Sequence, residues 1–175
     1  GHLAGLPLTI IFTLLLALSV IIGAVGFYFL ALAITGNILY GVFAAVLYSY
    51  TPYQAVDHFV RGTLGEVYAL AIFPWLLLCA WSLLQKVTSK RILALAIVVA
   101  LLIISHQPAA LFGLPLIAFI FVGYGLVTRH WPFLKAILAA LFLSLLLSAF
   151  YWIPVIFVEP QEFCQCDPTL GKETS

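Results

Sequence analysis

Charged side chains are scarce in this sequence, and one long stretch has none. Asp, Glu, Lys and Arg make up 7% of the 175 residues, whereas soluble domains carry about 25%. No charged residue occurs from Leu3 to Val56. As a helix this stretch would measure about 80 Å, and the hydrocarbon core of a bilayer is only about 30 Å thick. The shortage of charge therefore excludes a soluble domain and predicts a chain that crosses a membrane several times.

Cysteines and basic clusters are also lacking. Three cysteines are too few for a disulfide scaffold. Cys164 and Cys166 have no other metal ligands grouped with them, so they predict no metal site. A net charge of +1, with no basic cluster longer than three residues, excludes nucleic acid as a partner. The chain opens with neither an initiator Met nor a charged leader, so we expect a fragment of a longer protein.

Helix breakers and caps divide the apolar sequence into about six transmembrane or partly spanning helices. Gly36 and Asn37 suit the end of the first helix and the cap of the second, and Pro108 and Pro132 suit the first turns of the last two. The second and fourth helices have about 14 residues and measure about 21 Å, which is short for a full crossing. The expected helices cover residues 8–35, 38–50, 64–85, 91–104, 108–127 and 132–154.

We therefore predict an all-α fold, a polytopic membrane helical bundle over residues 1–158, followed by a polar tail over residues 159–175. Five of the seven positive residues fall in or beside two loops, which the positive-inside rule makes cytoplasmic. Residues 51–65, residues 105–108 and the polar tail are then extracytoplasmic. The five positive residues are Lys86, Lys90, Arg91, Arg129 and Lys135.

The stretch 51–66, "TPYQAVDHFVRGTLGE", gathers ionisable residues in an otherwise apolar chain. Asp57 and Arg61 are four residues apart, so on a helix they would share one face. Three interpretations stay open. The segment is an amphipathic interfacial helix whose charges stay in water, a surface that binds an anionic head group through the Arg61 guanidinium, or a contact with another subunit.

Two further positions carry polar side chains at predicted helix ends. Glu66 follows Thr63 by three residues, the capping-box spacing, so it predicts a helix cap, a ligand contact or both. His106 would either hydrogen-bond the carbonyls that end the fourth helix or contact a ligand beside the free N–H groups of the fifth. We expect one external polar site without metal ligands. Its candidate ligand-binding residues are Tyr53, Asp57, His58, Arg61, Glu66, His106 and Gln107.

Recognisable catalytic motifs are absent as well. The sequence contains no H-E-x-x-H, no P-loop and no G-x-S-x-G. Asp57 or Glu66 would be the candidate general base, but the sequence pairs neither with a nucleophile. The catalytic residues therefore stay unassigned, and composition and spacing alone predict a membrane protein with an external polar cluster.

Three segments together resemble a known family: "LYSYTPYQAVDHFVRGTLGEVYALAIFPWLLL", "LLIISHQPAALFGLPL" and "AFYWIPVIFVEPQEFCQCDP". In this order they resemble the prokaryotic membrane family labelled 6-pyruvoyl-tetrahydropterin synthase-related, except that Gln107 stands where that family has Asn. A soluble pterin synthase needs a three-histidine zinc site, which this sequence does not offer, so the label implies no such activity. The matching positions are Tyr50, Pro52, Tyr53, Arg61, Gly62, Glu66, Ser105, His106, Tyr151, Trp152, Pro154 and Glu159.

The resemblance further implies similarity to the C-type (GT-C) glycosyltransferases. A protein of that kind lies in the prokaryotic inner membrane and transfers a sugar from a polyprenyl-phosphate donor on the extracytoplasmic face. Its expected partners are the lipid bilayer and a polyprenyl-phosphate-linked sugar, and Arg61 and His106 would contact the donor phosphate. An acidic catalytic residue, and a divalent metal if one is used, would be held mainly by residues upstream of this chain.

Two other classes of function stay open. A transporter or flippase subunit would use the short second and fourth helices as broken helices around a substrate. A non-catalytic membrane scaffold would use residues 51–66 to dock a partner.

Overall fold

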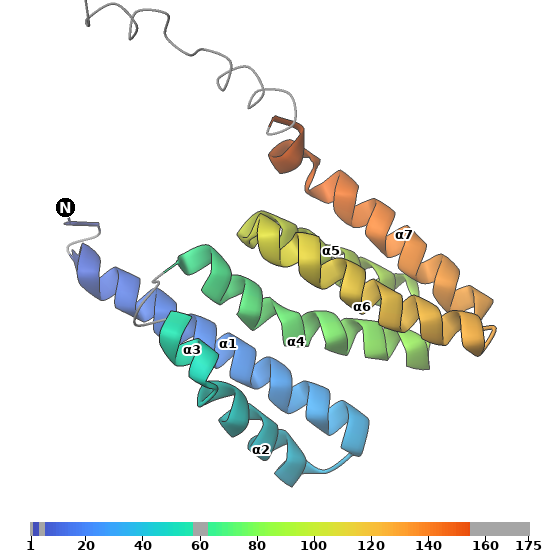
Figure 1. Ribbon diagram of the computed structural model, residues 1–175, viewed down its shortest axis with the longest axis horizontal. Helices are drawn as coiled ribbons and strands as arrows, with labels where there is room; N and C mark the ends of the chain where they lie inside the picture. The colour runs from blue at the N-terminus through green and yellow to red at the C-terminus, as the bar shows by residue number, and fades with distance from the viewer. Residues whose placement is uncertain (1, 4–5, 58–62, 155–175) are drawn as a thin grey trace, which may run out of the picture.

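The computed structural model of the protein describes residues 2–3, 6–57 and 63–154, and almost all of them are helical (Figure 1). A short antiparallel ribbon, β1 (His2–Leu3) paired with β2 (Leu6–Pro7), precedes the first helix. The predicted all-α membrane bundle is confirmed. The helices are α1 (Leu8–Thr35), α2 (Ile38–Ser49), α3 (Pro52–Val56), α4 (Leu64–Gln85), α5 (Ser89–Ser105), α6 (Gln107–Val127) and α7 (Trp131–Leu147).

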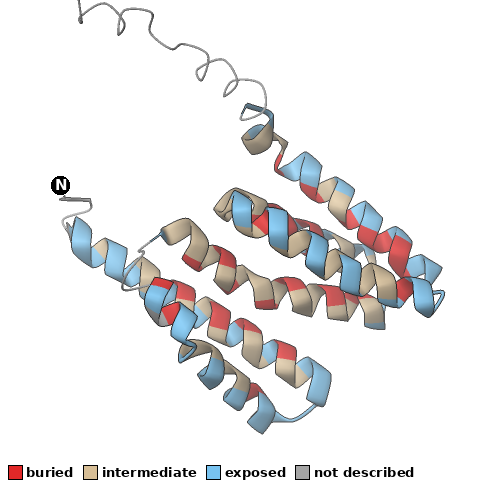
Figure 2. Ribbon diagram, viewed as in Figure 1, coloured by how far each residue is buried: buried red, intermediate tan, exposed pale blue. Residues whose placement is uncertain are grey.

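Three of these helices, α1, α4 and α6, are long and apolar enough to cross a membrane, with mean hydropathies of 2.7, 2.0 and 2.2. Helix α7 is apolar but shorter, at 17 residues. Buried residues concentrate along α4, α5 and α7, whereas α1, α2 and α6 expose much of their outer faces (Figure 2). Because those faces carry large apolar side chains, they suit contact with lipid rather than with water.

Apart from the short α3, successive helices along the chain run in opposite directions, and they pack in the order α2, α1, α4, α5 and α7 (Figure 1). The neighbours α1 and α4 are therefore parallel, as are α5 and α7. Helix α6 lies against α4, α5 and α7 with less contact. All connections therefore fall at two ends of the bundle. We call the end formed by residues 51–57, 63–66 and 105–107 the polar end. The opposite end, formed by residues 86–91 and 128–135, is the basic end.

Several helix boundaries follow directly from local sequence signals. Gly36 ends α1 with a φ of 68°, a left-handed conformation that glycine adopts without steric cost. Asn37 then caps α2, because its side chain accepts a hydrogen bond of 2.9 Å from the backbone N–H of Leu39. Pro108 lies in the first turn of α6. These caps confirm the predicted ends.

The segment after α2 forms a helix of its own, α3, which starts at Pro52 and agrees with the interpretation of residues 51–66 as helical. One boundary differs from the predictions. The last helix was expected to continue to residue 154, but α7 ends at Leu147 and residues 149–154 form a separate helical piece. The hydroxyl of Ser148 donates a hydrogen bond of 2.8 Å to the carbonyl of Ser144. A serine that bonds back to the preceding turn is typical of a bend in a helix, and the break falls at this residue.

Helices α1 and α4 are joined by two side-chain hydrogen bonds with the same spacing on both helices. The hydroxyl of Tyr68 donates to the carbonyl of Leu15 at 3.1 Å, and the indole N–H of Trp75 donates to the carbonyl of Ile22 at 3.0 Å. Gly26 lets the indole lie against α1, since a Cβ there would lie 2.8 Å from Trp75 Nε1. Small residues that admit such close contacts are typical of membrane helix interfaces. This interface fixes the start of α4, where the candidate site lies.

Candidate functional site

The carboxylate of Glu66 connects two helices at the polar end. It lies in the first turn of α4, where the positive end of the helix dipole favours an acidic side chain. Its Oε1 accepts a hydrogen bond from the hydroxyl of Tyr53 on α3, and its Oε2 accepts one of 3.2 Å from the hydroxyl of Thr63. Both carboxylate oxygens are therefore engaged within the protein, and they hold α3 against the start of α4.

The capping box expected from Thr63 and Glu66 does not form in its usual way. Thr63 is the N-cap of α4, but its side chain makes no hydrogen bond to a backbone N–H of the helix. It donates to the Glu66 carboxylate instead. The sequence pattern could not reveal this arrangement, because the hydroxyl of Tyr53 also binds that carboxylate and comes from a different helix.

Asp57 and Gln54 lie on the inner face of α3. Asp57, at the C-terminal end of α3, is 0% exposed, and Gln54, three residues earlier, is 5% exposed. Residues with this spacing share one side of a helix. One interpretation of the sequence kept these charges in water, and the burial of Asp57 corrects it for this residue. Because it is fully buried, this side chain belongs to the internal packing of the polar end, although burying a carboxylate is costly.

His106 joins α5 to α6 and caps the second of them. Its backbone is extended, and its Nδ1 accepts a hydrogen bond of 3.2 Å from the backbone N–H of Ala109. A neutral imidazole that accepts at Nδ1 carries its proton on Nε2. One interpretation of the sequence had the ring bonding the carbonyls that end α5. In the structure the ring caps α6 instead. Gln107 follows at the exposed first position of α6.

A glycine brings the start of α4 against this junction. A Cβ on Gly65 would lie 2.6 Å from the backbone oxygen of Ser105 and 3.7 Å from Cδ2 of His106. Only glycine therefore permits this approach. Tyr53, Glu66 and His106, which come from three separate parts of the sequence, are in this way brought to one end of the bundle (Figure 1).

The candidate residues His58 and Arg61 lie outside the described residues, as does the polar tail over residues 159–175. Among the residues that the structure describes, no three His, Cys, Asp or Glu side chains are grouped so that they could hold a metal ion. The placement of residues 51–65 and 105–108 outside the cell stays a prediction.

An apolar groove of about 750 Å³ opens at the start of α6, directly after His106 in the chain, and it was not predicted from the sequence. Gln107 lies at one end of the groove. Leu145 of α7 and Trp152 of the helical piece 149–154 line its other side. Gln107, Leu111 and Pro115 recur every four residues, which puts them on one face of α6. That spacing indicates a shared face but cannot reveal that the face is open. The groove is lined by Ile103, Gln107, Pro108, Ala110, Leu111, Phe112, Leu114, Pro115, Leu145 and Trp152.

Comparison with known proteins gives one match. No curated protein and no solved structure matches the chain. Residues 3–165 match a family of membrane proteins, which agrees with the three helices long enough to span a bilayer. The match covers nearly the whole sequence, including residues 51–57, 63–66 and 105–107, which form the polar end. The chain therefore belongs to the family described as 6-pyruvoyl-tetrahydropterin synthase related domain, a family of membrane proteins.

Proposed function

We propose that this chain is the membrane portion of an enzyme that binds a polyprenyl-phosphate-linked sugar at the polar end and transfers the sugar to an acceptor. The observation that carries the proposal is the apolar groove at the start of α6, which Gln107 lines and which His106 precedes by one residue in the chain. A long isoprenoid chain needs an apolar surface that opens to the bilayer, and its phosphate needs hydrogen-bond donors at one end of that surface. The groove and the polar end provide this combination.

Donors for the phosphate come from the junction between α5 and α6. The Nδ1 of His106 is engaged by α6, so the remaining ring nitrogen, Nε2, is the one that carries a donor proton. Gln107 adds a side-chain amide at the mouth of the groove. The third donor in this proposal is Arg61, whose planar guanidinium suits two phosphate oxygens. In this proposal the lipid chain follows α6 and the sugar faces the polar end.

Glu66 has a positioning role in this proposal. Its carboxylate is bound by Tyr53 and Thr63, so it fixes α3, and with it the buried Asp57, next to the start of α4. A base for the transfer reaction stays a sequence-level hypothesis for Asp57 or Glu66. Extracytoplasmic transfer in the prokaryotic inner membrane is part of the same proposal.

The test is binding of a polyprenyl-phosphate hexose to the full-length protein in nanodiscs. Leu111→Trp fills the groove and is expected to weaken binding by about tenfold or more, which corresponds to about 1.4 kcal/mol. Leu116→Trp is the matched control, because Leu116 lies on the same helix with a similar exposure, 63% against 69%, but does not line the groove. Equal binding by the two variants would contradict the groove assignment.

The donors are tested in the same assay. Arg61→Ala and His106→Ala are each expected to weaken binding by about tenfold, the usual cost of losing a hydrogen bond to a charged group. A soluble isoprenoid alcohol, which lacks the phosphate, should bind the Arg61→Ala and His106→Ala variants as well as it binds the native protein. If both substitutions leave binding of the phosphorylated lipid unchanged, the polar end is not its binding site.

One observation favours a second candidate, a transporter or flippase subunit. Helix α2 has 12 residues, about 18 Å, and is separated by Tyr50 and Thr51 from the short helix α3. Interrupted helices of this kind surround the substrate in many transporters. Transfer of labelled sugar from the lipid to an acceptor, measured beside uptake into proteoliposomes, distinguishes the two: uptake without transfer would favour the transporter.

A further inference from the structure

Charge is divided between the two ends of the bundle. In residues 2–3, 6–57 and 63–154, the acidic side chains are Asp57 and Glu66, and both lie at the polar end. All basic side chains of this described part lie at the opposite, basic end, around the α4–α5 and α6–α7 turns (Figure 1). They are Lys86, Lys90, Arg91, Arg129 and Lys135.

The cations at the basic end are not neutralised within the described protein, since none of the described acidic residues lies near them. Arg91 has a structural task, because its Nη1 donates to the backbone carbonyls of Ser82 and Lys86 and so caps the end of α4. Lys90, Arg129 and Lys135 are exposed, and no hydrogen bond to another described residue involves their side-chain nitrogens. Their charge faces the surroundings.

Exposed apolar side chains lie directly beside these cations. Val127 is 85% exposed and Trp131 is 60% exposed, and Arg129 stands between them in the sequence. Tryptophan next to basic residues at the end of a membrane helix is the composition of a membrane–water interface. Free phosphate would satisfy the cations but would leave Val127 and Trp131 in water. A phospholipid satisfies both, because its head group meets the cations and its chains cover the apolar side chains.

The backbone at this end adds further donors. Helices α5 and α7 both begin here, and neither N-terminus is capped by a side chain, in contrast to α2 and α6. The first N–H groups of a helix favour anions. They lie on the same side as the exposed cations and would reinforce them.

We propose that the basic end binds the anionic head groups of the phospholipids in the membrane that the bundle spans. The inference is independent of the sugar-transfer proposal, which concerns the other end of the molecule. The lipid phosphate contacts Lys90, Arg129 and Lys135, and its chains lie along α6 and α7 beside Val127 and Trp131. This contact holds the two turns at the membrane surface.

The experiment measures the preference of the full-length protein for spin-labelled phosphatidylglycerol over spin-labelled phosphatidylcholine in vesicles of the two lipids. The native protein is expected to prefer the anionic lipid by about fivefold. In the variant with Lys90→Gln, Arg129→Gly and Lys135→Gln, the preference is expected to fall to about one. Arg91 is left unchanged because it caps α4.

The Arg129→Gly substitution protects the test against misfolding. Arg129 has a φ of 54°, a left-handed conformation that costs a non-glycine residue energy, so glycine there relieves strain while it removes the charge. The control variant, with Lys90→Arg, Arg129→Lys and Lys135→Arg, keeps all three charges and is expected to keep the preference. Unfolding of each variant is measured in parallel.

Three results would overturn the proposal. The first is an equal affinity of the native protein for the two lipids. The second is a preference that survives in the charge-free variant while that variant unfolds like the native protein. The third is loss of the preference when inorganic phosphate is added at constant ionic strength, which would identify free phosphate as the ligand.

Discussion

Helices α4 and α6 are almost equal in length, 22 and 21 residues, but they relate to the bundle in different ways. Within its most apolar window, 39% of α4 is buried, against 11% of α6. Helix α4 is bonded to α1 through Tyr68 and Trp75 and touches the α5–α6 junction through Gly65. Helix α6 borders the open groove. Helix α4 is therefore the fixed support of the polar end, whereas α6 offers a surface to lipid.

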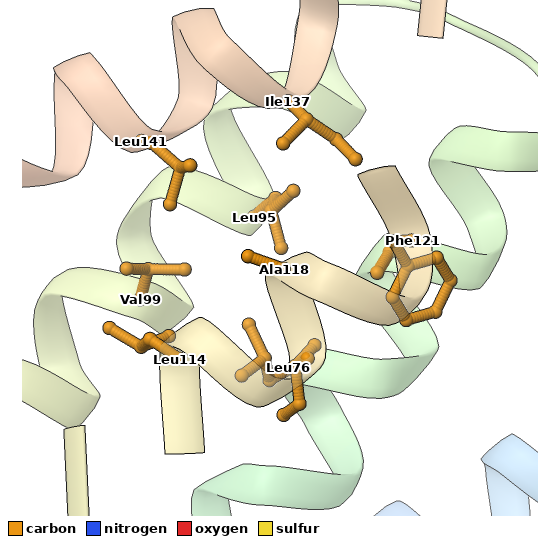
Figure 3. A pocket seen from close by; sticks show the side chains of 10 residues that line it. Leu76, Leu95, Val99, Leu114, Ala118, Phe121, Ile137 and Leu141 are labelled. Atoms are coloured by element: carbon orange, nitrogen blue, oxygen red, sulfur yellow. The ribbon is translucent and has the colours of Figure 1, made fainter. Parts of the chain in front are cut away.

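A small cavity under α6 marks the same difference. It measures about 40 Å³ and lies where Leu114 and Ala118 of α6 face Leu76, Leu95 and Ile137 from the other helices (Figure 3). All ten residues that line it are apolar, so a water molecule there would have no hydrogen-bond partner and the cavity is expected to be dry. Packing is therefore incomplete where α6 lies against α4, α5 and α7.

The largest expected effect comes from a methyl group added at the start of α4, compared with the same addition in α6. Gly65→Ala places a Cβ 2.6 Å from the backbone oxygen of Ser105, so the start of α4 must move away from the junction. We expect a loss of about 2 kcal/mol in the free energy of unfolding. Gly123→Ala in α6 is the control, because a Cβ there meets nothing within 4 Å. Denaturant titration of the full-length protein in micelles measures both, and equal stabilities would remove the contrast between the helices.

The second prediction breaks the hydrogen bond between α1 and α4. Trp75→Phe keeps an aromatic ring but removes the N–H that donates to the carbonyl of Ile22. The expected destabilisation is about 1 kcal/mol, typical of a hydrogen bond between membrane helices together with some lost packing. Trp131→Phe at the exposed start of α7 should leave the unfolding free energy unchanged within error. A similar loss in both variants would show that ring size, not the bond, matters.

The third prediction concerns the link from α3 to α4. Glu66→Gln weakens the hydrogen bonds from Tyr53 and Thr63, and Tyr53→Phe removes one of them. Each single substitution is expected to cost about 1 kcal/mol in unfolding free energy. The double variant should cost less than the sum of the two, with a coupling of about 0.5 kcal/mol or more. Strict additivity would mean that the two side chains do not interact in the folded protein.

The smallest expected effect is a gain beneath α6. Ala118→Val adds two methyl groups toward the cavity and is expected to stabilise the protein by about 0.5 kcal/mol, which a rise in the thermal midpoint would report. Ala139→Val on the exposed side of α7 provides the comparison at a position away from the cavity. If only Ala118→Val lowers the stability, the cavity is too small for two further methyl groups and the prediction is wrong.

Much of the fold could be predicted because its signals are local. Gly36, Asn37 and Pro108 act on the backbone of their own turns, so the helix ends they mark agree with the structure. The long run without charge indicated membrane spans for the same reason. The break at Ser148 was missed because the sequence continues past it with no glycine or proline before Pro154.

The candidate site could be predicted only in part, since its geometry depends on contacts between distant segments. The spacing of Thr63 and Glu66 correctly indicated the start of α4, but it did not indicate the partner, Tyr53, on another helix. The role of His106 as the cap of α6 needs a backbone turn that the sequence does not specify. Asp57 was expected in water by one interpretation because charge usually stays there, whereas the packing of α3 buries it.

The shortness of α2 has a consequence for the bilayer itself. Helix α1 measures about 42 Å and its neighbour α2 only about 18 Å, so lipids along the flank of α2 meet an apolar wall much thinner than a normal hydrocarbon core. A mismatch of this size is relieved by local thinning of the membrane and by tilting of the longer helix. On that flank the membrane–water boundary therefore lies closer to the bilayer centre, near α3 and its Tyr53.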